Sequence, residues 1–250
     1  MVKTSARATA TRIAHVALLW AFVALLLATA DGRLDGDDHY ALWSVRSIQA
    51  GVPFYDPGSP LQSWLSYLGQ ALSGYRTVGE LALAVAFRVA GIIAVYQLGK
   101  RLTGQGSAVL GAAGVALMTL GSTVYGCERL MLYPLACLLF WRYREGRLAP
   151  GWLGVLAATA FLLRHDHGLY VGLVGGLLIA LTNWRHLPRY AVTAIIVLSP
   201  WLLWVQLSEG VVVYFERRLD FSITLGLTNT RPSLLELTLP FTPRESLLWL

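Results

Sequence analysis

The sequence predicts an all-α, polytopic helical membrane protein with about seven transmembrane helices. Of its 250 residues, 56% are hydrophobic and 14% are charged, whereas about a quarter of the residues of an ordinary soluble domain are charged. The mean hydropathy is +0.56. Long apolar segments follow one another between residues 12 and 207, and each bilayer crossing needs about 20 such residues. These observations exclude a soluble globular protein.

The expected spans are the apolar runs that are long enough to form membrane helices. In chain order they cover residues 12–30, 79–99, 106–125, 129–142, 151–164, 168–184 and 190–207. The fourth and fifth spans are short. Together the spans define a transmembrane domain over residues 1–207.

The distribution of charge predicts the orientation of these spans. With the N-terminus inside, the inner face has one acid, Glu145. The bases expected on that face are Lys3, Arg7, Arg12, Lys100, Arg101, Arg142, Arg144, Arg147, Arg185 and Arg189. Because cytoplasmic loops are enriched in Lys and Arg, we expect a cytoplasmic N-terminus. The net charge of +6 does not indicate a nucleic-acid partner, because the bases form short clusters between apolar segments.

The first apolar segment has a second interpretation. Basic residues precede it, and it ends in Ala28-Thr29-Ala30, the small-x-small pattern of a cleaved signal peptide. Cleavage would leave the orientation of the next span unchanged. The expected topology of the remaining chain is therefore the same in both cases.

The first external loop, residues 31–78, is expected to carry amphipathic helices that lie in the membrane interface. Its second helical stretch has apolar residues at the three-four spacing of one helix face. These residues are Leu61, Trp64, Leu65, Leu68, Leu72 and Tyr75. Because Trp and Tyr favour the headgroup region, the stripe predicts a helix that lies on the membrane. A loop helix that caps the bundle is the alternative.

Residues 208–250 are expected to form a second external segment. Near its end, Thr242-Pro243-Arg244-Glu245 precedes an apolar run. This pattern offers an N-cap, a proline at the first helical position and a capping-box acid. We therefore expect a further transmembrane helix to begin here and the chain to be the N-terminal portion of a longer protein. A natural stop codon directly after Leu250 would contradict that expectation.

An acidic cluster directly outside the first span is the strongest candidate for chemistry. It contains Asp31, Asp35, Asp37 and Asp38. Carboxylates at the mouth of a membrane bundle can take a proton from a hydroxyl group, position that group or hold a divalent cation. A solvated, negatively charged loop is the alternative interpretation.

Several short motifs, taken in their order along the chain, resemble one family. The first loop contains Asp37-Asp38-x-Tyr40, Gly51-Val-Pro-Phe-Tyr55-Asp56 and Pro60-Leu61. The later motifs are Phe87-Arg88, Tyr96-Gln-Leu-Gly-Lys-Arg-Leu-Thr-Gly104 and Phe161-Leu-Leu-Arg164-His-Asp166-His-Gly168. This order looks like that of the C-superfamily (GT-C) membrane glycosyltransferases, nearest to the protein mannosyltransferase and aminoarabinose transferase branch. The resemblance covers most of residues 12–207.

The resemblance implies a donor sugar linked to polyprenyl phosphate and a lipid, glycan or protein acceptor on the outer side. It also implies a multi-pass protein of the cell membrane, as in the bacterial inner-membrane relatives. In that family a first-loop acid is the proposed catalytic residue, which gives this role to Asp37 or Asp38. Asp38 stands where relatives have Glu. Asp35 is a further candidate, and Asp35 and Tyr40 are expected to contact substrate.

The implied reaction is a single displacement that inverts the configuration of the sugar. No cofactor is assigned, and a divalent metal at the carboxylates stays open as an alternative. Neutralising Asp37 or Asp38 to Asn is expected to abolish transfer and leave membrane insertion intact.

Three more charged residues are expected near the substrate. Arg88 lies in the second span, where an unpaired charge is costly, and its guanidinium suits a donor phosphate. Pairing with a first-loop aspartate is the alternative. Glu128 and Arg129 stand at the outer end of the third or fourth span, where the resemblance implies an acid that contacts metal or acceptor. A local ion pair at the membrane interface is the alternative for them.

Arg164, His165, Asp166 and His167 cluster at the outward turn between two short spans. We expect Arg164 to screen the donor phosphate, Asp166 to bind substrate and the turn to face the same cavity as the first loop. Two histidines with an acid also suggest a metal site. Neighbouring residues on a tight turn rarely converge on one ion, so no metal ligand is assigned.

A transporter or channel is the main alternative function, since the same charges would then line a conduction path. The sequence has neither an internal repeat nor paired broken helices in matching halves, which many transporters have. A non-enzymatic membrane scaffold is a third interpretation. Consumption of a lipid-linked sugar would indicate the enzyme, and solute flux without it would indicate the transporter.

Overall fold

The computed structural model describes residues 2–29, 60–74, 78–119, 128–220 and 223. Within these ranges the chain is helical apart from short turns, and no strand occurs among them. The all-α prediction is therefore confirmed. The chain divides into two compact units, Met1–Leu198 and Ser199–Leu250, which are described separately.

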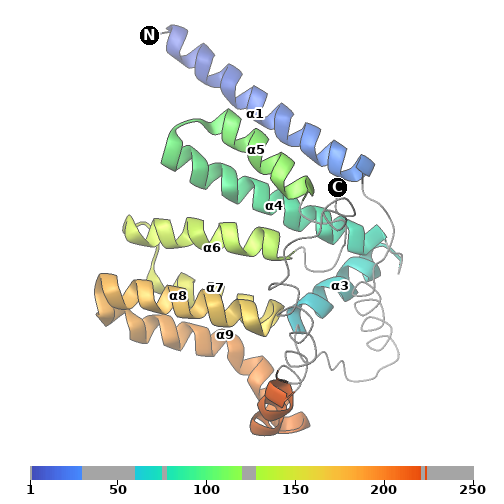
Figure 1. Cartoon of the computed structure of the whole chain (residues 1–250), viewed down its shortest axis with the longest axis vertical. Helices are drawn as coiled ribbons and strands as arrows, with labels where there is room; N and C mark the ends of the chain where they lie inside the picture. The colour runs from blue at the N-terminus through green and yellow to red at the C-terminus, as the bar shows by residue number, and fades with distance from the viewer. Residues whose placement is uncertain (1, 30–59, 75–77, 120–127, 221–222, 224–250) are drawn as a thin grey trace, which may run out of the picture. The chain divides into compact units, whose positions relative to one another are not determined.

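The helices follow the predicted apolar segments closely. They are α1 (Val2–Thr29), α3 (Pro60–Leu72), α4 (Val78–Thr103), α5 (Gly106–Thr119), α6 (Glu128–Arg144), α7 (Pro150–Leu163), α8 (His165–Asn183), the 3₁₀ turn η1 (Trp184–His186) and α9 (Leu187–Ser208) (Figure 1). Residues 211–220 are also helical. Each expected span is thus helical over its described residues, except that Arg164, at the end of the fifth span, is extended. Helix α1 begins ten residues before the expected span at residue 12, because its polar first turns continue the same helix.

The described helices include segments that are long and apolar enough to cross a membrane. These segments are Val78–Thr103 and the stretch His165–Ser208, which contains α8, η1 and α9. Shorter apolar helices cover Ile13–Phe22, Gly106–Ala116 and Pro150–Leu163. The chain is a helical membrane protein. The count of about seven crossings and the cytoplasmic N-terminus stay predictions.

Helix α4 packs against both α5 and α6 (Figure 1). On one side, Ile92 packs with Phe22 of α1 and Leu110 of α5. On the other side Gly91 faces the backbone of Leu130 in α6, where a Cβ atom would collide with the carbonyl oxygen. Small residues at such contacts let membrane helices approach closely, so Gly91 determines the spacing of α4 and α6.

Helices α7 and α8 form the tightest hairpin of the first unit. A single extended residue, Arg164, joins them, with φ −158° and ψ 134°. Directly after it, Gly168 of α8 packs on the backbone of Phe161 in α7 with no room for a Cβ atom. The hairpin is therefore closed from its first turn, which fixes the residues at the connection.

Helices α4, α6 and α8 run in the same direction. Gly91 of α4 lies against Leu130 of α6. Farther along both helices, Arg142 of α6 donates a hydrogen bond to Gln97 of α4. Tyr133 of α6 is hydrogen-bonded to His167 in the first turn of α8, and Tyr143 near the end of α6 is hydrogen-bonded to His186 in η1, which follows α8. The helix starts thus share one end of the unit, here called the site end, marked by Glu80, Glu128 and Arg164. The opposite end, called the basic end, is marked by Lys100, Arg101, Arg142 and Arg144.

Helix α3 packs on the site end with its polar face inward. The prediction of a helix with an apolar stripe is confirmed: Trp64, Leu68 and Leu72 are 53%, 54% and 82% exposed. The polar residues Gln62, Ser63, Ser66 and Gln70 are buried instead. The helix therefore covers the bundle with polar groups and with Leu65, which packs on Ala84 and Phe87, and presents its exposed apolar residues outward. Tyr75, the last member of the predicted stripe, lies outside the described residues.

In the second unit, the end of α9 packs with the helix over residues 211–220. Gly210 has a φ of 89°, a left-handed conformation that favours glycine, and allows the turn between them. Trp201 and the buried Tyr214 meet edge to face, with ring centroids 5.5 Å apart. This aromatic contact closes the hairpin.

Candidate functional site

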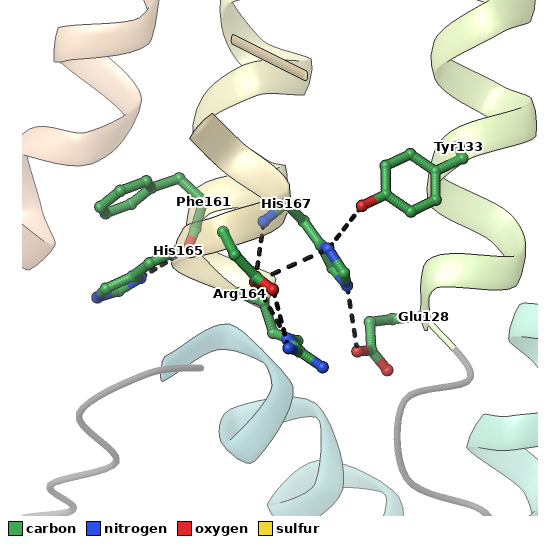
Figure 2. Close-up of polar contacts among 7 residues, drawn as sticks. Glu128, Tyr133, Phe161, Arg164, His165 and His167 are labelled. Carbon is green, nitrogen blue, oxygen red and sulfur yellow. Dashed lines mark hydrogen bonds and ion pairs between the residues drawn. The ribbon is translucent and has the colours of Figure 1, made fainter. Parts of the chain in front are cut away.

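A group of polar side chains from three elements meets at the site end (Figure 2). Helix α6 begins at Glu128 and carries Tyr133 one turn later, while Arg164 stands between α7 and α8. Asp166 and His167 belong to the first turn of α8. Acidic groups are favoured at helix N-termini because the first backbone N–H groups have no partner within the helix. Two adjacent helix starts therefore bring Glu128 and Asp166 to the same end.

Arg164 and Asp166 form a bidentate ion pair at the edge of this group. Arg164 Nε donates to Asp166 Oδ1 at 3.1 Å, and Nη2 donates to Oδ2 at 2.9 Å. The backbone N–H of His167 also donates to Asp166 Oδ1, at 2.9 Å. The side chains of Arg164 and Asp166 are 33% and 46% exposed. The pair therefore fixes the connection between α7 and α8 and remains accessible.

His167 lies deeper and links α8 to α6. Its Nδ1 atom is hydrogen-bonded to the hydroxyl of Tyr133 at 2.8 Å, and the two rings meet edge to face. On the other side of the ring, Nε2 lies 3.9 Å from Glu128 Oε1 (Figure 2). The side chains of His167 and Glu128 are only 7% and 1% exposed. Burial of a carboxylate is unfavourable unless polar groups surround it.

His165 points away from His167. Its ring stacks on Phe161 with centroids 4.2 Å apart, and its Nδ1–H donates to the Phe161 carbonyl at 3.0 Å. Figure 2 shows the two histidines directed to different neighbours. Within the described part of the chain, no three His, Cys, Asp or Glu side chains converge as metal ligands.

The structure brings several of the expected site residues together. Glu128, Arg164 and Asp166 belong to the group described above, and Arg129 is exposed beside Glu128 on α6. Arg88 is half-buried in α4, ten residues after its start at Val78. Ten residues correspond to about 15 Å along a helix. Arg88 therefore lies well inside α4, whereas the other charged residues stand at helix ends.

The first-loop candidates lie outside the described residues. They are Asp35, Asp37, Asp38 and Tyr40. These residues lie between α1 and α3, and the last residue of α1 and helix α3 are both at the site end. Helix α1 is antiparallel to α4. His15 of α1 is hydrogen-bonded to Tyr96 of α4, and Phe22, which comes after His15 in α1, packs on Ile92, which comes before Tyr96 in α4. Its last residue therefore points toward the site end, where α3 also packs on the first turn of α4.

Tyr133 is the member of the group that the sequence did not reveal. A tyrosine within an apolar helix is ordinary and needs no functional explanation. The available signal was the presence of a hydroxyl group one turn after Glu128 inside an otherwise apolar span. Its partner, His167, is 34 residues away, so the pairing depends on how α6 and α8 pack.

Comparison with known proteins identifies the family. No curated protein and no solved structure matches the chain. The family model of the dolichyl-phosphate-mannose-protein mannosyltransferases matches residues 56–204. This range contains Glu128, Arg164 and Asp166 and begins after the candidate aspartates Asp35, Asp37 and Asp38. Since this match covers more than half of the chain, the protein belongs to the dolichyl-phosphate-mannose-protein mannosyltransferase family and is a membrane glycosyltransferase.

Proposed function

We propose that this protein transfers a sugar from a polyprenyl-phosphate donor to an acceptor hydroxyl at the outer surface of the cell membrane. Family membership supports sugar transfer from a lipid-linked donor. The observation that carries the proposal is the polar group at the site end, where apolar helices hold Glu128, Arg164, Asp166 and His167 together. Charged residues in such helices are costly and therefore indicate a functional site.

In the proposed reaction, Asp37 or Asp38 takes the proton of the acceptor hydroxyl. The acceptor oxygen then attacks the anomeric carbon of the sugar. The bond from this carbon to the phosphate oxygen breaks, and polyprenyl phosphate leaves. One displacement inverts the anomeric configuration. A carboxylate suits the role of base because it is charged and can be held at hydrogen-bond distance from the hydroxyl.

Arginine side chains assist departure of the phosphate in this proposal. The guanidinium group has five donors in a planar fork that matches phosphate oxygens. Asp166 accepts from two nitrogen atoms of Arg164, which holds the fork at the site end in a fixed direction. Arg88 acts from within α4, where a lipid-linked phosphate would enter from the side.

Two geometric facts support a role for the first loop at this site. The part of the first loop that carries the candidate aspartates joins the end of α1 to the start of α3. Helix α3 contacts α7 as well as α4, and Glu80 in the first turn of α4 binds α3. The chain that carries Asp35, Asp37 and Asp38 is therefore tethered on both sides to the site end.

The test measures the release of polyprenyl phosphate from a labelled polyprenyl-phosphate sugar in membranes that contain the full chain. We expect donor consumption by the wild type and none by the Asp37→Asn, Asp38→Asn double variant, with equal membrane insertion. The single variants identify which aspartate is the base. The Glu145→Gln variant, altered at the basic end, is the matched control and keeps its activity.

Two outcomes would contradict the proposal. Full activity of both single variants and of the double variant would remove the catalytic role of these aspartates. Solute flux across the membrane without donor consumption would favour a transporter. Repeating the assay with EDTA tests whether a divalent metal takes part.

A further inference from the structure

Glu128 and His167 present buried polar atoms that have no hydrogen-bond partner among the described residues. These atoms are Glu128 Oε2 and His167 Nε2. The two side chains face each other, but the nearest approach, from Nε2 to Oε1, is 3.9 Å (Figure 2). Leaving such groups buried without hydrogen bonds is unfavourable, because each has lost its contact with water. The pair therefore has unused capacity to bind a polar group.

Tyr133 determines which atom of His167 can donate. Its hydroxyl lies 2.8 Å from Nδ1 and can donate to that atom, which then carries no proton in the neutral ring. The ring proton is then on Nε2 and points toward the carboxylate of Glu128. This tautomer is assigned as part of the inference, since a tyrosine hydroxyl can either donate to a histidine nitrogen or accept from it. The pair thus consists of one N–H donor next to a carboxylate acceptor.

The separation of the pair matches a single bridging oxygen atom. A hydrogen bond to such an oxygen is about 2.8 Å long, and two bonds of this length from atoms 3.9 Å apart meet at about 90°. This angle is smaller than the tetrahedral angle of about 109° between the O–H bond and a lone pair of a hydroxyl oxygen, a deviation that hydrogen bonds tolerate. One hydroxyl group can therefore accept from His167 Nε2 and donate to Glu128 at the same time.

The surroundings favour a hydroxyl of the donor sugar. Arg164 and Asp166 are partly exposed and lie next to the pair, since Asp166 Oδ1 is 3.7 Å from His167 Nδ1. In the proposed function, Arg164 receives the donor phosphate, to which the sugar is directly bonded. A sugar whose phosphate is at Arg164 carries its ring hydroxyls within reach of the adjacent pair.

We infer that Glu128 and His167, the latter oriented by Tyr133, bind one hydroxyl group of the transferred sugar and thereby select the donor. The inference rests on the proposed function and adds a sugar-recognition site to it. Sites built to hydrogen-bond a hydroxyl reject analogues that lack it, because their buried polar groups would be left unpaired. Selectivity among sugars that differ at one hydroxyl follows directly.

The experiment uses the full chain in membranes with polyprenyl-phosphate mannose and its monodeoxy derivatives, each of which lacks one ring hydroxyl. For the wild type, we expect kcat/KM to fall about 10- to 100-fold for one derivative. The His167→Leu variant is expected to use that derivative and the parent donor equally well. The His167→Gln variant, which keeps an N–H donor, restores part of the selectivity.

The protein offers a matched control at the basic end. Tyr143 and His186 form a second tyrosine–histidine pair, between α6 and η1, with a 3.0 Å hydrogen bond. The His186→Leu variant removes an equivalent contact far from Glu128 and keeps the selectivity of the wild type. If His167→Leu does not fold, Glu128→Gln repeats the test with a change of one atom.

The outcomes separate this inference from the function on which it rests. If the wild type consumes no polyprenyl-phosphate sugar in the functional assay, both fail together. The wild type can instead consume polyprenyl-phosphate mannose but show, for every monodeoxy derivative, the same fall in kcat/KM as the His167→Leu and Glu128→Gln variants. In that case only the recognition site is overturned. A pair that merely binds water in the folded protein gives this second result.

Discussion

Gln70 Nε2 donates a hydrogen bond of 2.6 Å to Glu80 Oε1 and so joins α3 to the first turn of α4. The other carboxylate oxygen of Glu80 accepts from Ser66 Oγ at 3.0 Å. All three side chains are buried. Leu65 adds an apolar contact with Ala84 and Phe87, and the buried polar anchor specifies which face of α3 meets the bundle.

Replacing Glu80 with Ala is expected to detach α3. The change leaves the donors of Ser66 and Gln70 buried without an acceptor, which costs about 1–3 kcal/mol for each group. We expect a lower midpoint of thermal unfolding in detergent and faster proteolysis within residues 60–74. Glu216→Ala, which removes an exposed carboxylate, is the control. Equal midpoints and cleavage rates for the two variants would contradict the anchor.

A second prediction concerns the hairpin of α7 and α8. In Gly168→Ala the new Cβ atom collides with the backbone of Phe161, which cannot move away as a flexible side chain would. Overpacking of this kind destabilises a protein by about 1–3 kcal/mol. Thermal unfolding of Gly111→Ala gives the comparison, because nothing lies within 4 Å of that Cβ position. A midpoint as high as that of Gly111→Ala would show that the hairpin adjusts without cost.

The third prediction concerns pH and the exposed turn after α6. The indole N–H of Trp141 donates to Glu145 Oε1 at 2.7 Å and lowers the pKa of Glu145 below its ordinary value of 4.5, and Arg101 and Arg147 act in the same direction. A carboxyl whose pKa is lowered by folding stabilises the folded state above its unfolded pKa. That contribution is lost as the pH falls through the folded pKa.

The difference in stability between wild type and Glu145→Gln is therefore expected to be present at neutral pH and to vanish in the acid range below 4.5. Unfolding midpoints measured across this range give the comparison, and Trp141 fluorescence reports the titration. In Trp141→Phe the transition should move to higher pH. A difference that persists unchanged at the lowest pH would rule out this assignment.

The helices of this protein were predictable because their apolar runs are local. Burial of the polar face of α3 was not, because it depends on Glu80, which lies 10 residues beyond Gln70 and 14 beyond Ser66. The stripe of Trp64, Leu68 and Leu72 identified a helix but not the partner of its opposite face. A hydrophobic pattern gives a helix its two faces, and tertiary contacts decide which of them is covered.

The same distinction applies to the candidate site. Arg164 and Asp166 are two residues apart, so their association at a helix start could be expected from the sequence. The contact of His167 with Tyr133 requires α6 and α8 to lie side by side, which no local pattern specifies. The divergence of His165 and His167 follows from the helical turn that begins at His165, since neighbouring side chains of a helix point in different directions.

The last prediction separates two roles of Arg164, holding Asp166 and binding phosphate. Lys in its place keeps the charge but loses the planar fork. We expect Arg164→Lys to raise KM for the polyprenyl-phosphate donor about tenfold. The midpoint of thermal unfolding should change little, because the ion pair with Asp166 is partly exposed and such pairs contribute little stability. Arg142→Lys, at the basic end, is the matched control. A lower midpoint with an unchanged KM would assign Arg164 to structure alone, since a phosphate-binding arginine acts on the donor and a structural one acts on the hairpin.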